Sequence, residues 1–255
     1  MKAVILAGGF GTRISEETHL KPKPMIEIGG MPILWHIMKH YSAYGFDEFV
    51  VALGYKGEYI KRYFVDFLSL AGSLTVDLEQ ASVTRMGDPC ENWKVHLIDT
   101  GLSTNTGGRV RRLADLIGKE SFMLTYGDGV CNVDLKGLLK CHSRSNALAT
   151  VTAVRPPARF GGLDLNGDLV KEFQEKPQMG EGWINGGFMV LEPEVLDMLY
   201  GDDSNLERNA LEPLAEQGKL AGYQHPGFWQ CMDTLRDKRL LESLWNQPDP
   251  PWKTW

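Results

Sequence analysis

The chain has 255 residues, of which 43% are hydrophobic and 24% are charged, and its formal net charge is −6. This length suffices for one large α/β domain, and the acidic balance argues against a general nucleic-acid binder, whose surface would be basic. Four cysteines without a C-x-x-C pair, no run of 18 apolar residues and no basic-then-apolar leader lead us to expect a cytoplasmic protein that is neither secreted nor membrane-spanning.

The first predicted element is a buried strand over residues 3–7, which ends in a glycine-rich loop over residues 8–11. Successive backbone N–H groups of such a loop can point into one anion-binding concavity. The loop is not a P-loop, because no lysine before Ser or Thr follows its last glycine. It is not a dinucleotide fingerprint either, because Ile14 stands where a third small residue is needed.

Two cations follow the glycine loop. Arg13 comes almost directly after it, and Lys23 lies ten residues further on, between Pro22 and Pro24. The prolines hold the lysine in an extended segment, which limits where its ammonium group can reach. A surface turn with two solvated charges is the alternative, but the combination of loop, cations and prolines favours a phosphate-binding site.

Helices and strands then alternate. The hydrophobic spacing predicts a helix from Ile33 to about Gly45, a strand over residues 49–53, a helix over residues 57–70 and a strand over residues 74–79. This order is typical of a parallel sheet that is covered by helices on both faces.

Residues 81–107 are less regular and rich in turn residues. We expect a loop that is mobile without nucleotide and ordered with it, and a rigid, self-packed loop is the alternative. A helix is predicted from Gly108. Arg109, Arg111 and Arg112 near its start could face a phosphate, although a solvated basic face is as plausible.

Residues 121–126 predict another buried strand, which ends in Gly127-Asp128-Gly129. A helix over residues 135–143 and a strand over residues 147–154 complete a doubly wound unit. Asp128 therefore stands at the carboxyl end of a central strand, where open α/β sheets bind their ligands.

The pattern then changes. Residues 162–173 predict a hairpin on an Asn-Gly turn, which would add antiparallel pairing to an otherwise parallel sheet. A strand over residues 184–191, two short helices, a strand over residues 220–225 and a helix over residues 235–245 follow. The sequence shows no internal repeat and no linker that would divide the chain, so we predict a single domain of 255 residues.

Two carboxylates and the C-terminal tail complete the set of candidate features. Asp128 could be a turn residue and Asp233 a helix cap, but next to a phosphate loop two hard oxygen ligands suit Mg²⁺. Trp245, Trp252 and Trp255 crowd a proline-rich tail, which predicts an apolar contact surface and a homo-oligomer.

Two motifs carry a family resemblance: residues 6–13, Leu-Ala-Gly-Gly-x-Gly-Thr-Arg, and residues 22–25, Pro-Lys-Pro-Met. Together they resemble the signature of the sugar-1-phosphate nucleotidylyltransferases, and residues 14–21 resemble its glucose-1-phosphate cytidylyltransferase branch. The similarity extends to about residue 245. It implies a doubly wound, mostly parallel, Rossmann-like and GT-A-like α/β fold with an antiparallel hairpin subdomain, in which residues 1–155 bind the nucleotide and residues 156–255 contain the sugar-binding part and the C-terminal helices.

The resemblance also implies an activity. A member of this branch would transfer a cytidylyl group from CTP to α-D-glucose 1-phosphate, giving CDP-glucose and pyrophosphate, with Mg²⁺ as the cofactor. The product would feed dideoxyhexose and O-antigen lipopolysaccharide biosynthesis, and the enzyme would be a homo-oligomer, a trimer or a hexamer.

Roles for individual residues follow from the same resemblance. Arg13 and the glycine loop would hold the β- and γ-phosphates, Lys23 would stabilise charge on the α-phosphate, and Asp128 and Asp233 would bind the metal. Lys176 would position the sugar phosphate. Further substrate contacts are expected from Leu6, Ala7, Gly8, Gly9, Gly11, Thr12, Gln80, Thr104, Thr106, Gly107, Arg109, Gly127, Gly161, Gly162 and Asn185.

Other functions stay open at this point. A related enzyme could use another base or another hexose 1-phosphate. A glycosyltransferase of similar fold is disfavoured because the chain lacks a well-placed Asp-x-Asp motif. A nucleotide-sugar sensor without turnover is disfavoured because it would not need Arg13, Lys23, Asp128 and Asp233 together.

Overall fold

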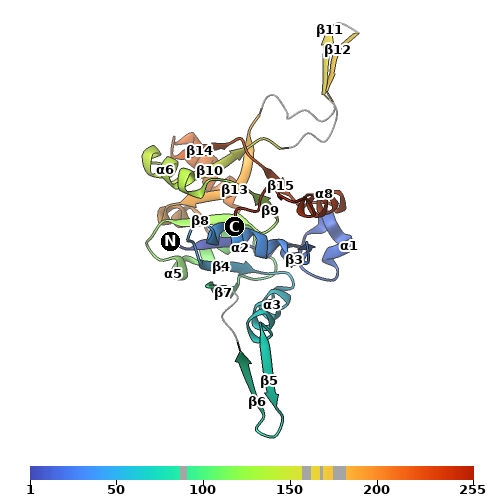
Figure 1. Cartoon of the computed structure of the whole chain (residues 1–255). Coiled ribbons are helices and arrows are strands. Elements are labelled where there is room, and N and C mark those ends of the chain that lie inside the picture. The colour runs from blue at the N-terminus through green and yellow to red at the C-terminus, as the bar shows by residue number, and fades with distance from the viewer. Residues whose placement is uncertain (87–90, 157–161, 167–168, 175–181) are drawn as a thin grey trace.

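The structure is a computed structural model of the whole chain, and it describes residues 1–86, 91–156, 162–166, 169–174 and 182–255. Its centre is a seven-stranded sheet of strand order β14-β10-β13-β8-β1-β4-β7 (Figure 1). The strands are β1 (Ala3–Leu6), β4 (Glu48–Leu53), β7 (Lys94–Asp99), β8 (Phe122–Tyr126), β10 (Ala149–Val154), β13 (Ile184–Leu191) and β14 (Leu220–His225).

The sheet is mostly parallel, as predicted. Strand β1 pairs in parallel with β4 and β8, β4 pairs in parallel with β7, and β10 pairs in parallel with β14. Strand β13 is antiparallel to both of its neighbours, β8 and β10. The antiparallel member of the sheet is thus β13 and not the hairpin over residues 162–173, contrary to the expectation.

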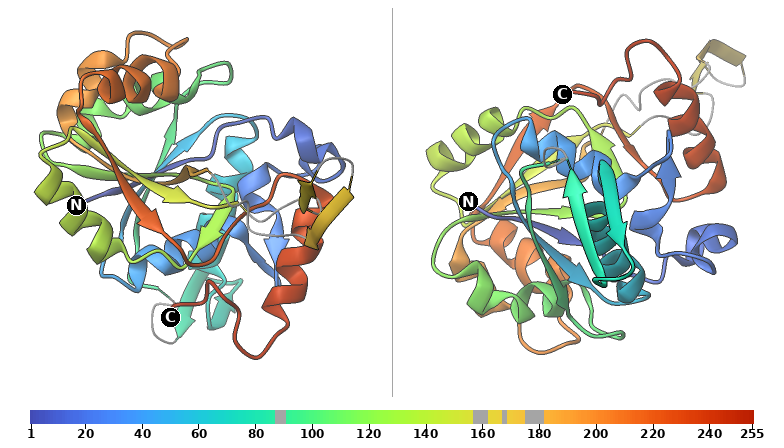
Figure 2. Two further views of the ribbon diagram at one scale, coloured as in Figure 1. Left: turned by 90° about the horizontal axis from the view of Figure 1, so that it is seen from above. Right: turned by 60° about the horizontal axis from the view of Figure 1, so that its bottom comes forward.

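Helices cover both faces of the sheet (Figure 2). Because side chains alternate along a strand, Ala3 and Ile5 join the core on one face and Val4 and Leu6 join the core on the other. The first core includes side chains of α2 (Ile33–Ser42), α6 (Leu135–Ser145) and α8 (Leu235–Trp245). The second includes α4 (Thr106–Arg112), α5 (Ala114–Ile117), α7 (Glu212–Glu216) and the short helices η3 (Pro193–Met198) and η4 (Glu207–Leu211).

Residues 81–107 were expected to form one long loop, but the structure places two strands in this range. Strand β5 (Ser73–Asp77) does not join the central sheet but pairs with β6 (Ser82–Met86) in an antiparallel hairpin. The third parallel strand is β7, whose apolar residues are mixed with polar ones because it is a half-exposed edge strand. The prediction of an irregular loop over this range was therefore wrong, whereas its ordering by nucleotide stays a prediction.

Smaller elements frame the central sheet. The predicted hairpin over residues 162–173 is present as β11 (Gly162–Asn166) and β12 (Leu169–Gln174), but it forms a two-stranded sheet of its own that stands apart in Figure 1. The remaining elements are η1 (Thr12–Ile14), α1 (Ser15–Thr18), η2 (Lys23–Met25), β2 (Glu27–Ile28), β3 (Met31–Pro32), α3 (Gly57–Ser69), β9 (Gly129–Cys131) and β15 (Trp229–Cys231).

The C-terminal tail folds back onto α2. Trp252 is fully buried, and the rings of Trp245 and His36 lie 4.7 Å apart, centroid to centroid. The tail tryptophans belong to the chain's own core, so they do not form the exposed apolar surface that was expected of them. In the part of the chain that the structure describes, no helix combines the length and the apolar character that crossing a bilayer requires.

Candidate active site

A cleft of about 490 Å³ opens at the carboxyl ends of β1 and β8. Its volume is in the range that small-molecule sites occupy. The register pairs Leu6 with Tyr126, so the loops that follow these two strands lie side by side. The cleft is lined by Leu6, Ala7, Gly8, Gly9, Phe10, Gly11, Thr12, Arg13, Lys23, Pro24, Leu102, Ser103, Thr104, Asn105, Thr106, Arg109, Tyr126, Gly127, Asp128 and Asp203.

Two positions of the loop require glycine, each for a different structural reason. Gly11 has φ +64° at the start of η1, in the left-handed region that glycine adopts without strain. Gly8 lies against the guanidinium group of Arg109, and a Cβ atom at this position would overlap it. By contrast, Gly9 has open space around it, so its backbone is accessible from the cleft.

Arg109 is a buried brace beneath the glycine loop, with 5% of its surface exposed. Burial lowers the pKa of Arg109, and the nearby Arg112 lowers it further. The guanidinium group donates hydrogen bonds of 2.7–3.2 Å to Gly8 O, Leu53 O, Thr100 Oγ1, Gly101 O and Leu102 O. Arg109 therefore ties together the loops that follow β1, β4 and β7.

The other two arginines of α4 point elsewhere. Arg112 forms a bidentate pair with Asp202, at 2.7 and 2.8 Å, and Arg111 lies 4.0 Å from Asp197. The three arginines do not converge on one anion, contrary to one of the two expectations for this helix.

Four charged side chains form a cluster next to the cleft, and three of them, Arg13, Lys23 and Asp128, line it. Lys23 Nζ donates to Asp128 Oδ2 and to Asp233 Oδ1, each at 2.6 Å, and Arg13 Nη1 donates to Asp233 Oδ2 at 2.6 Å. Lys23 and Asp233 are 8% and 7% exposed. The cluster joins η2, the turn between β8 and β9, and the segment between β15 and α8, which lie far apart in the sequence.

The two buried charges of this cluster, those of Lys23 and Asp233, depend on their partners. Burial opposes the charge on Lys23, but the charges and hydrogen bonds of Asp128 and Asp233 outweigh it and raise the lysine pKa. Burial would likewise raise the pKa of Asp233, but Lys23 and then Arg13 lower it. Lys23 and Asp233 are consequently stable as ions although both are buried.

The alternative role of Asp233 as a helix cap does not hold. Thr234 is the N-cap of α8, and it forms a capping box with Asp237. The Asp233 carboxylate does not cap the helix and takes part in the cluster, where it and the Asp128 carboxylate both accept hydrogen bonds from the Lys23 ammonium group.

The pair of aspartates fits a divalent metal ion. Both offer hard oxygen ligands, and Mg²⁺ typically takes one or two carboxylates and fills its other positions with water and phosphate oxygens. Within the described residues no group of three or more His, Cys, Asp or Glu side chains gathers as a metal site. A metal here would depend on these two carboxylates together with substrate.

Tyr126 connects the cleft with the start of β13. Its hydroxyl group donates to Glu207, whose carboxylate also accepts a hydrogen bond of 3.1 Å from Thr106 Oγ1. Its ring packs against Gly187, where a Cβ atom would lie only 2.6 Å from the ring. Asn185 Oδ1 accepts from Gly187 N at 2.9 Å, so the turn expected to bind sugar lies next to Tyr126.

The structure brings most of the candidate residues together, although not all. Gln80 lies in the turn of the β5–β6 hairpin, Gly107 packs against Leu199 and Ser204, and Gly162 begins β11; none of the three is among the described residues that line the cleft. Gly161 and Lys176 lie outside the described residues.

The sequence analysis did not predict some of the residues at the site. Tyr126 had a usable signal, because it directly precedes Gly127 and Asp128 at the end of a predicted strand. Asp203 had none, since it reaches the cleft only through the packing of α4 on the segment before η4. Glu207 had none either; it does not line the cleft but accepts hydrogen bonds from Tyr126 and Thr106.

Comparisons with known proteins bear on this site. The family described as nucleotidyl transferase matches residues 2–233. A glucose-1-phosphate cytidylyltransferase of Salmonella typhimurium is 50% identical over 256 residues, with 100% of both chains covered. A probable glucose-1-phosphate cytidylyltransferase of Bacillus subtilis is 47% identical, again with 100% of both chains covered.

Solved structures share the fold. The crystal structure of HddC from Yersinia pseudotuberculosis has a TM-score of 0.70 and 24% identity, and covers 96% of this chain and 99% of its own. The structure of a UDP-glucose pyrophosphorylase complexed with UDP-glucose has a TM-score of 0.66 and 16% identity, and covers 96% of this chain and 97% of its own.

Proposed function

The chain belongs to the nucleotidyl transferase family, and we propose that it transfers a cytidylyl group from CTP to α-D-glucose 1-phosphate, giving CDP-glucose and pyrophosphate. The observation that carries the reaction is the cluster of Arg13, Lys23, Asp128 and Asp233 beside the glycine loop. The choice of CTP and glucose 1-phosphate is supported by the full-length identity to two proteins that bear the cytidylyltransferase name.

The reaction needs positioning and charge stabilisation more than covalent chemistry. An oxygen of the sugar phosphate attacks the α-phosphorus of CTP, and the bond from that phosphorus to the bridging oxygen of the leaving pyrophosphate breaks. The backbone N–H groups of the glycine loop and the guanidinium of Arg13 hold the departing phosphates, and Lys23 stabilises the charge that grows on the α-phosphate. Arg13 lines the cleft and its side chain is largely exposed, so a ligand in the cleft can contact it directly.

We propose that Asp128 and Asp233 hold Mg²⁺, which when bound neutralises nucleotide oxygens. The Lys23 ammonium already contacts both carboxylates, so it offsets their mutual repulsion when no metal is present. The same side chain is then close enough to the cleft to interact with a phosphate group.

The remaining expectations extend this proposal. Asn185 and Lys176 are proposed to contact the glucose 1-phosphate, and the product is proposed to serve dideoxyhexose and O-antigen lipopolysaccharide biosynthesis. We also propose a homo-oligomer, a trimer or a hexamer. A cytoplasmic location rests on the expectation of reduced thiols, and Cys131, Cys141 and Cys231 are free.

Pyrophosphate release tests the reaction. The protein is incubated with Mg²⁺, one of four nucleoside triphosphates and one of several hexose 1-phosphates. Release that is fastest with CTP and glucose 1-phosphate supports the proposal. Fastest release with another pair would reassign the substrates, and saturable CDP-glucose binding without release in any pair would make the protein a sensor.

A further inference from the structure

The turn expected to bind sugar, residues 185–187, belongs to a bulge in β13. Asn185 pairs with Ala153 of β10. The next pair along β13 is Met189 with Val151, so three residues of β13 stand opposite one residue of β10. A bulge bends its strand and re-aims the residues around it, and bulges are frequent next to active sites. The position of the turn therefore depends on what holds the bulge in place.

Side chains form hydrogen bonds to two carbonyl groups of the bulge. Thr152 Oγ1 donates to Phe188 O at 2.6 Å. The indole Nε1 of Trp229 donates to Gly186 O at 2.7 Å, which is at the short end for an N–H···O bond. Gly186 is buried, and a buried carbonyl group without a partner is costly. Trp229 therefore stabilises this conformation of the turn.

Trp229 reaches the turn from the two-stranded ribbon that carries both candidate metal ligands. It begins β15, which pairs with β9 in antiparallel orientation. Asp128 directly precedes β9, and Asp233 is the second residue after β15. A Cβ atom at Gly129 would lie 3.9 Å from the indole nitrogen, so the indole lies close to this residue as well as to Gly186. One hydrogen bond thus joins the sugar turn to the ribbon of the two carboxylates.

Tyr126 makes a second contact with the turn. Its ring packs against Gly187, and it precedes Asp128 by two residues in the chain. This contact is apolar and tolerates small displacements, whereas the hydrogen bond from Trp229 depends on distance and direction. Of the two contacts, the one from Trp229 is the one that fixes the distance between the turn and the ribbon.

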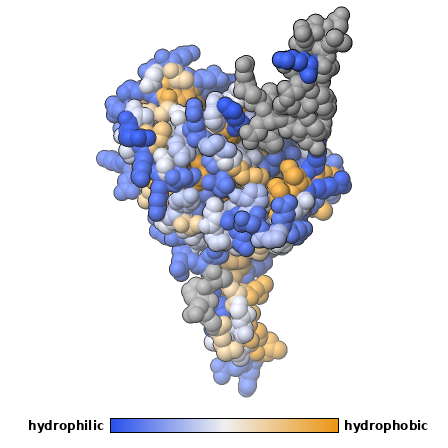
Figure 3. Space-filling model, turned by 45° about the horizontal axis from the view of Figure 1, so that its top comes forward, coloured by the Kyte–Doolittle hydropathy of each residue, from blue (hydrophilic) through white to orange (hydrophobic). Residues whose placement is uncertain are grey.

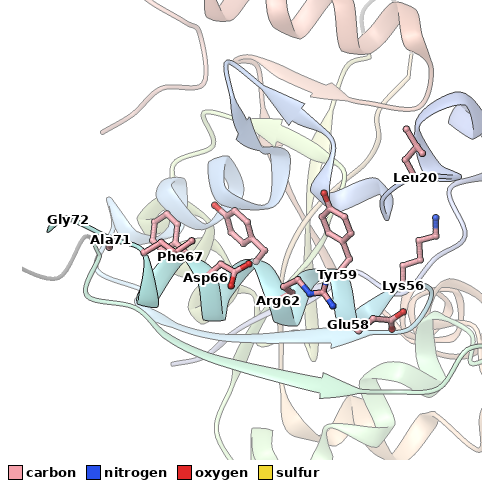
Figure 4. A pocket seen from close by; sticks show the side chains of 11 residues that line it. Leu20, Lys56, Glu58, Tyr59, Arg62, Asp66, Phe67, Ala71 and Gly72 are labelled. Carbon is pink, nitrogen blue, oxygen red and sulfur yellow. The ribbon is translucent and has the colours of Figure 1, made fainter. Parts of the chain in front are cut away.

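Other prominent surface features lie elsewhere in the molecule. Hydrophobic colour marks the projecting β5–β6 hairpin (Figure 3), and a groove of about 1040 Å³ runs along α3 from Leu20 to Gly72 (Figure 4). Neither the hairpin nor the groove shares a described residue with the lining of the cleft. The sugar phosphate has to reach the nucleotide in the cleft, so these features cannot position it.

We propose that Trp229 is a positioning residue for the hexose phosphate, because its indole N–H group fixes the sugar turn relative to Asp128 and Asp233. The inference rests on the proposed function, in particular on the contact of Asn185 with glucose 1-phosphate. The attacking oxygen has to lie about 3–3.5 Å from the α-phosphorus, and a displacement of about 1 Å can lower the rate about 10²-fold. A turn that is fixed to the ribbon presents the sugar phosphate at a constant distance from the two carboxylates.

Trp229→Phe tests this role, because it removes the N–H group and keeps an aromatic ring. The KM for the hexose 1-phosphate should rise about 10-fold and kcat should fall about fivefold, whereas the KM for the nucleotide and the Mg²⁺ requirement should stay within about twofold of the parent values. Pyrophosphate release with the parent protein's preferred substrate pair measures all four. Trp35→Phe is the matched control, since the Trp35 N–H group is buried without a hydrogen-bond partner among the described residues, and its loss should leave these constants unchanged.

Trp229→His separates the hydrogen bond from the packing of the ring. The imidazole Nε2 is as many bonds from Cβ as the indole Nε1, so it can supply the donor again, whereas phenylalanine keeps more apolar area. The role predicts a KM for the hexose 1-phosphate that is closer to the parent value with histidine than with phenylalanine. The reverse order would overturn the role, since it would show that only the packing of the ring matters.

Amide hydrogen exchange of residues 184–188 gives a readout that needs no turnover. These amides should exchange faster in Trp229→Phe than in the parent or in Trp35→Phe, and far-UV circular dichroism establishes that each variant is folded. A parent protein that releases no pyrophosphate with any substrate pair would overturn the proposed function and this role together. An active parent whose Trp229→Phe variant keeps the parent KM for the hexose 1-phosphate, or the parent exchange at the turn, would overturn this role alone.

Discussion

At the scale of single residues, the charged cluster is the most informative feature. Lys23 forms ion pairs with two carboxylates, those of Asp128 and Asp233, whereas Arg13 pairs with Asp233 and its side chain is largely exposed to solvent. A buried ion that loses its partner is costly, at about 3–5 kcal/mol, while a solvated one loses little. The four residues therefore have unequal weight in the stability of the free protein, and variants can separate structural from catalytic contributions.

Lys23→Ala should lower turnover by about 10² to 10³, the usual loss when one electrostatic stabiliser of a transition state is removed, with a smaller change in CTP affinity. Steady-state pyrophosphate release measures both. Lys21→Ala is the matched control, because Lys21 lies two residues away and pairs only with the half-exposed Glu27 at 2.7 Å. Turnover near that of the parent would remove Lys23 from the mechanism.

Asp128→Asn and Asp233→Asn should each raise the Mg²⁺ concentration needed for half-maximal activity, because an amide is a neutral and poorer ligand. Asp233→Asn should in addition lower the melting temperature of the metal-free protein more than Asp128→Asn does, since Asp233 compensates two cations and Asp128 one. Magnesium titration and thermal unfolding give the two readouts. Unchanged titration curves in both variants would contradict the metal assignment.

At the scale of elements, Arg109 acts as a joint between three strand ends. Its guanidinium group bonds to carbonyl oxygens after β1, β4 and β7, and so fixes the glycine loop relative to residues 100–102. Both segments contribute residues to the lining of the cleft, so the shape of the cleft depends on a residue that was expected either to contact substrate or to lie on a solvated face.

Arg109→Lys should lower the free energy of unfolding by about 2–3 kcal/mol, because an ammonium group cannot reach all these acceptors and buried carbonyls are left unpaired. Urea unfolding without ligand measures the change. Arg111→Lys, on the same helix but 4.0 Å from its acidic neighbour, is the control and should change stability little. A raised KM for CTP with unaltered unfolding would make Arg109 a substrate contact and nothing more.

The elements also show what sequence reasoning can reach. The strands β1, β4 and β8 are continuous apolar runs, because helices cover them on both faces, and they were placed correctly. Strand β7 is half exposed and mixes apolar with polar residues, so it was not predicted. Strand β5 has the composition of a strand but no place in the central sheet, so it was assigned to the wrong sheet. Periodicity reports burial, and it contains no information on which strand a segment will pair with.

The same distinction holds for the cleft. The glycine loop, Lys23 and Asp128 could be found because each sits in a recognisable local motif. Glu207 could not, because it is positioned by a π-helical turn and by hydrogen bonds to Tyr126 and Thr106, which come from other parts of the chain. Contacts over such sequence separations follow from the whole packing and not from any short pattern.

At the scale of the whole molecule, the sheet has a core on each face, and the C-terminal tail closes the one that contains α2. Trp252 and Trp245 pack around His36 of α2, and Trp252 Nε1 donates to His36 Nδ1 at 3.4 Å. His36 and His40 are nearly inaccessible, and burial lowers the pKa of each to about 4. The packing around α2 thus requires both imidazole rings to be neutral.

Stability should consequently decrease in mild acid. Between pH 6.5 and about 4 the unfolded chain binds protons on His36 and His40 that the folded chain does not, so the free energy of unfolding falls as the pH falls through this window. At full effect each histidine contributes roughly 3 kcal/mol. Above pH 7 these two groups add no pH dependence.

Urea unfolding at a series of pH values checks this expectation. The double variant His36→Gln with His40→Gln should have a flatter dependence of stability on pH, whatever its absolute stability. His19→Gln, a change at an exposed histidine, should keep the slope of the parent protein. Equal slopes in the parent and the double variant would show that other groups cause the acid sensitivity.

The buried Trp252 has a consequence for how the chain is made. It is the fourth residue from the C-terminus and yet it is fully enclosed among side chains of α2, α8 and the segment around Phe228. During synthesis Trp252 leaves the ribosome after α2, α8 and the segment around Phe228, against which it packs. This core is therefore completed only after Trp252 has emerged, and a nascent chain or a truncation that lacks residues 252–255 should expose aromatic surface and recruit chaperones.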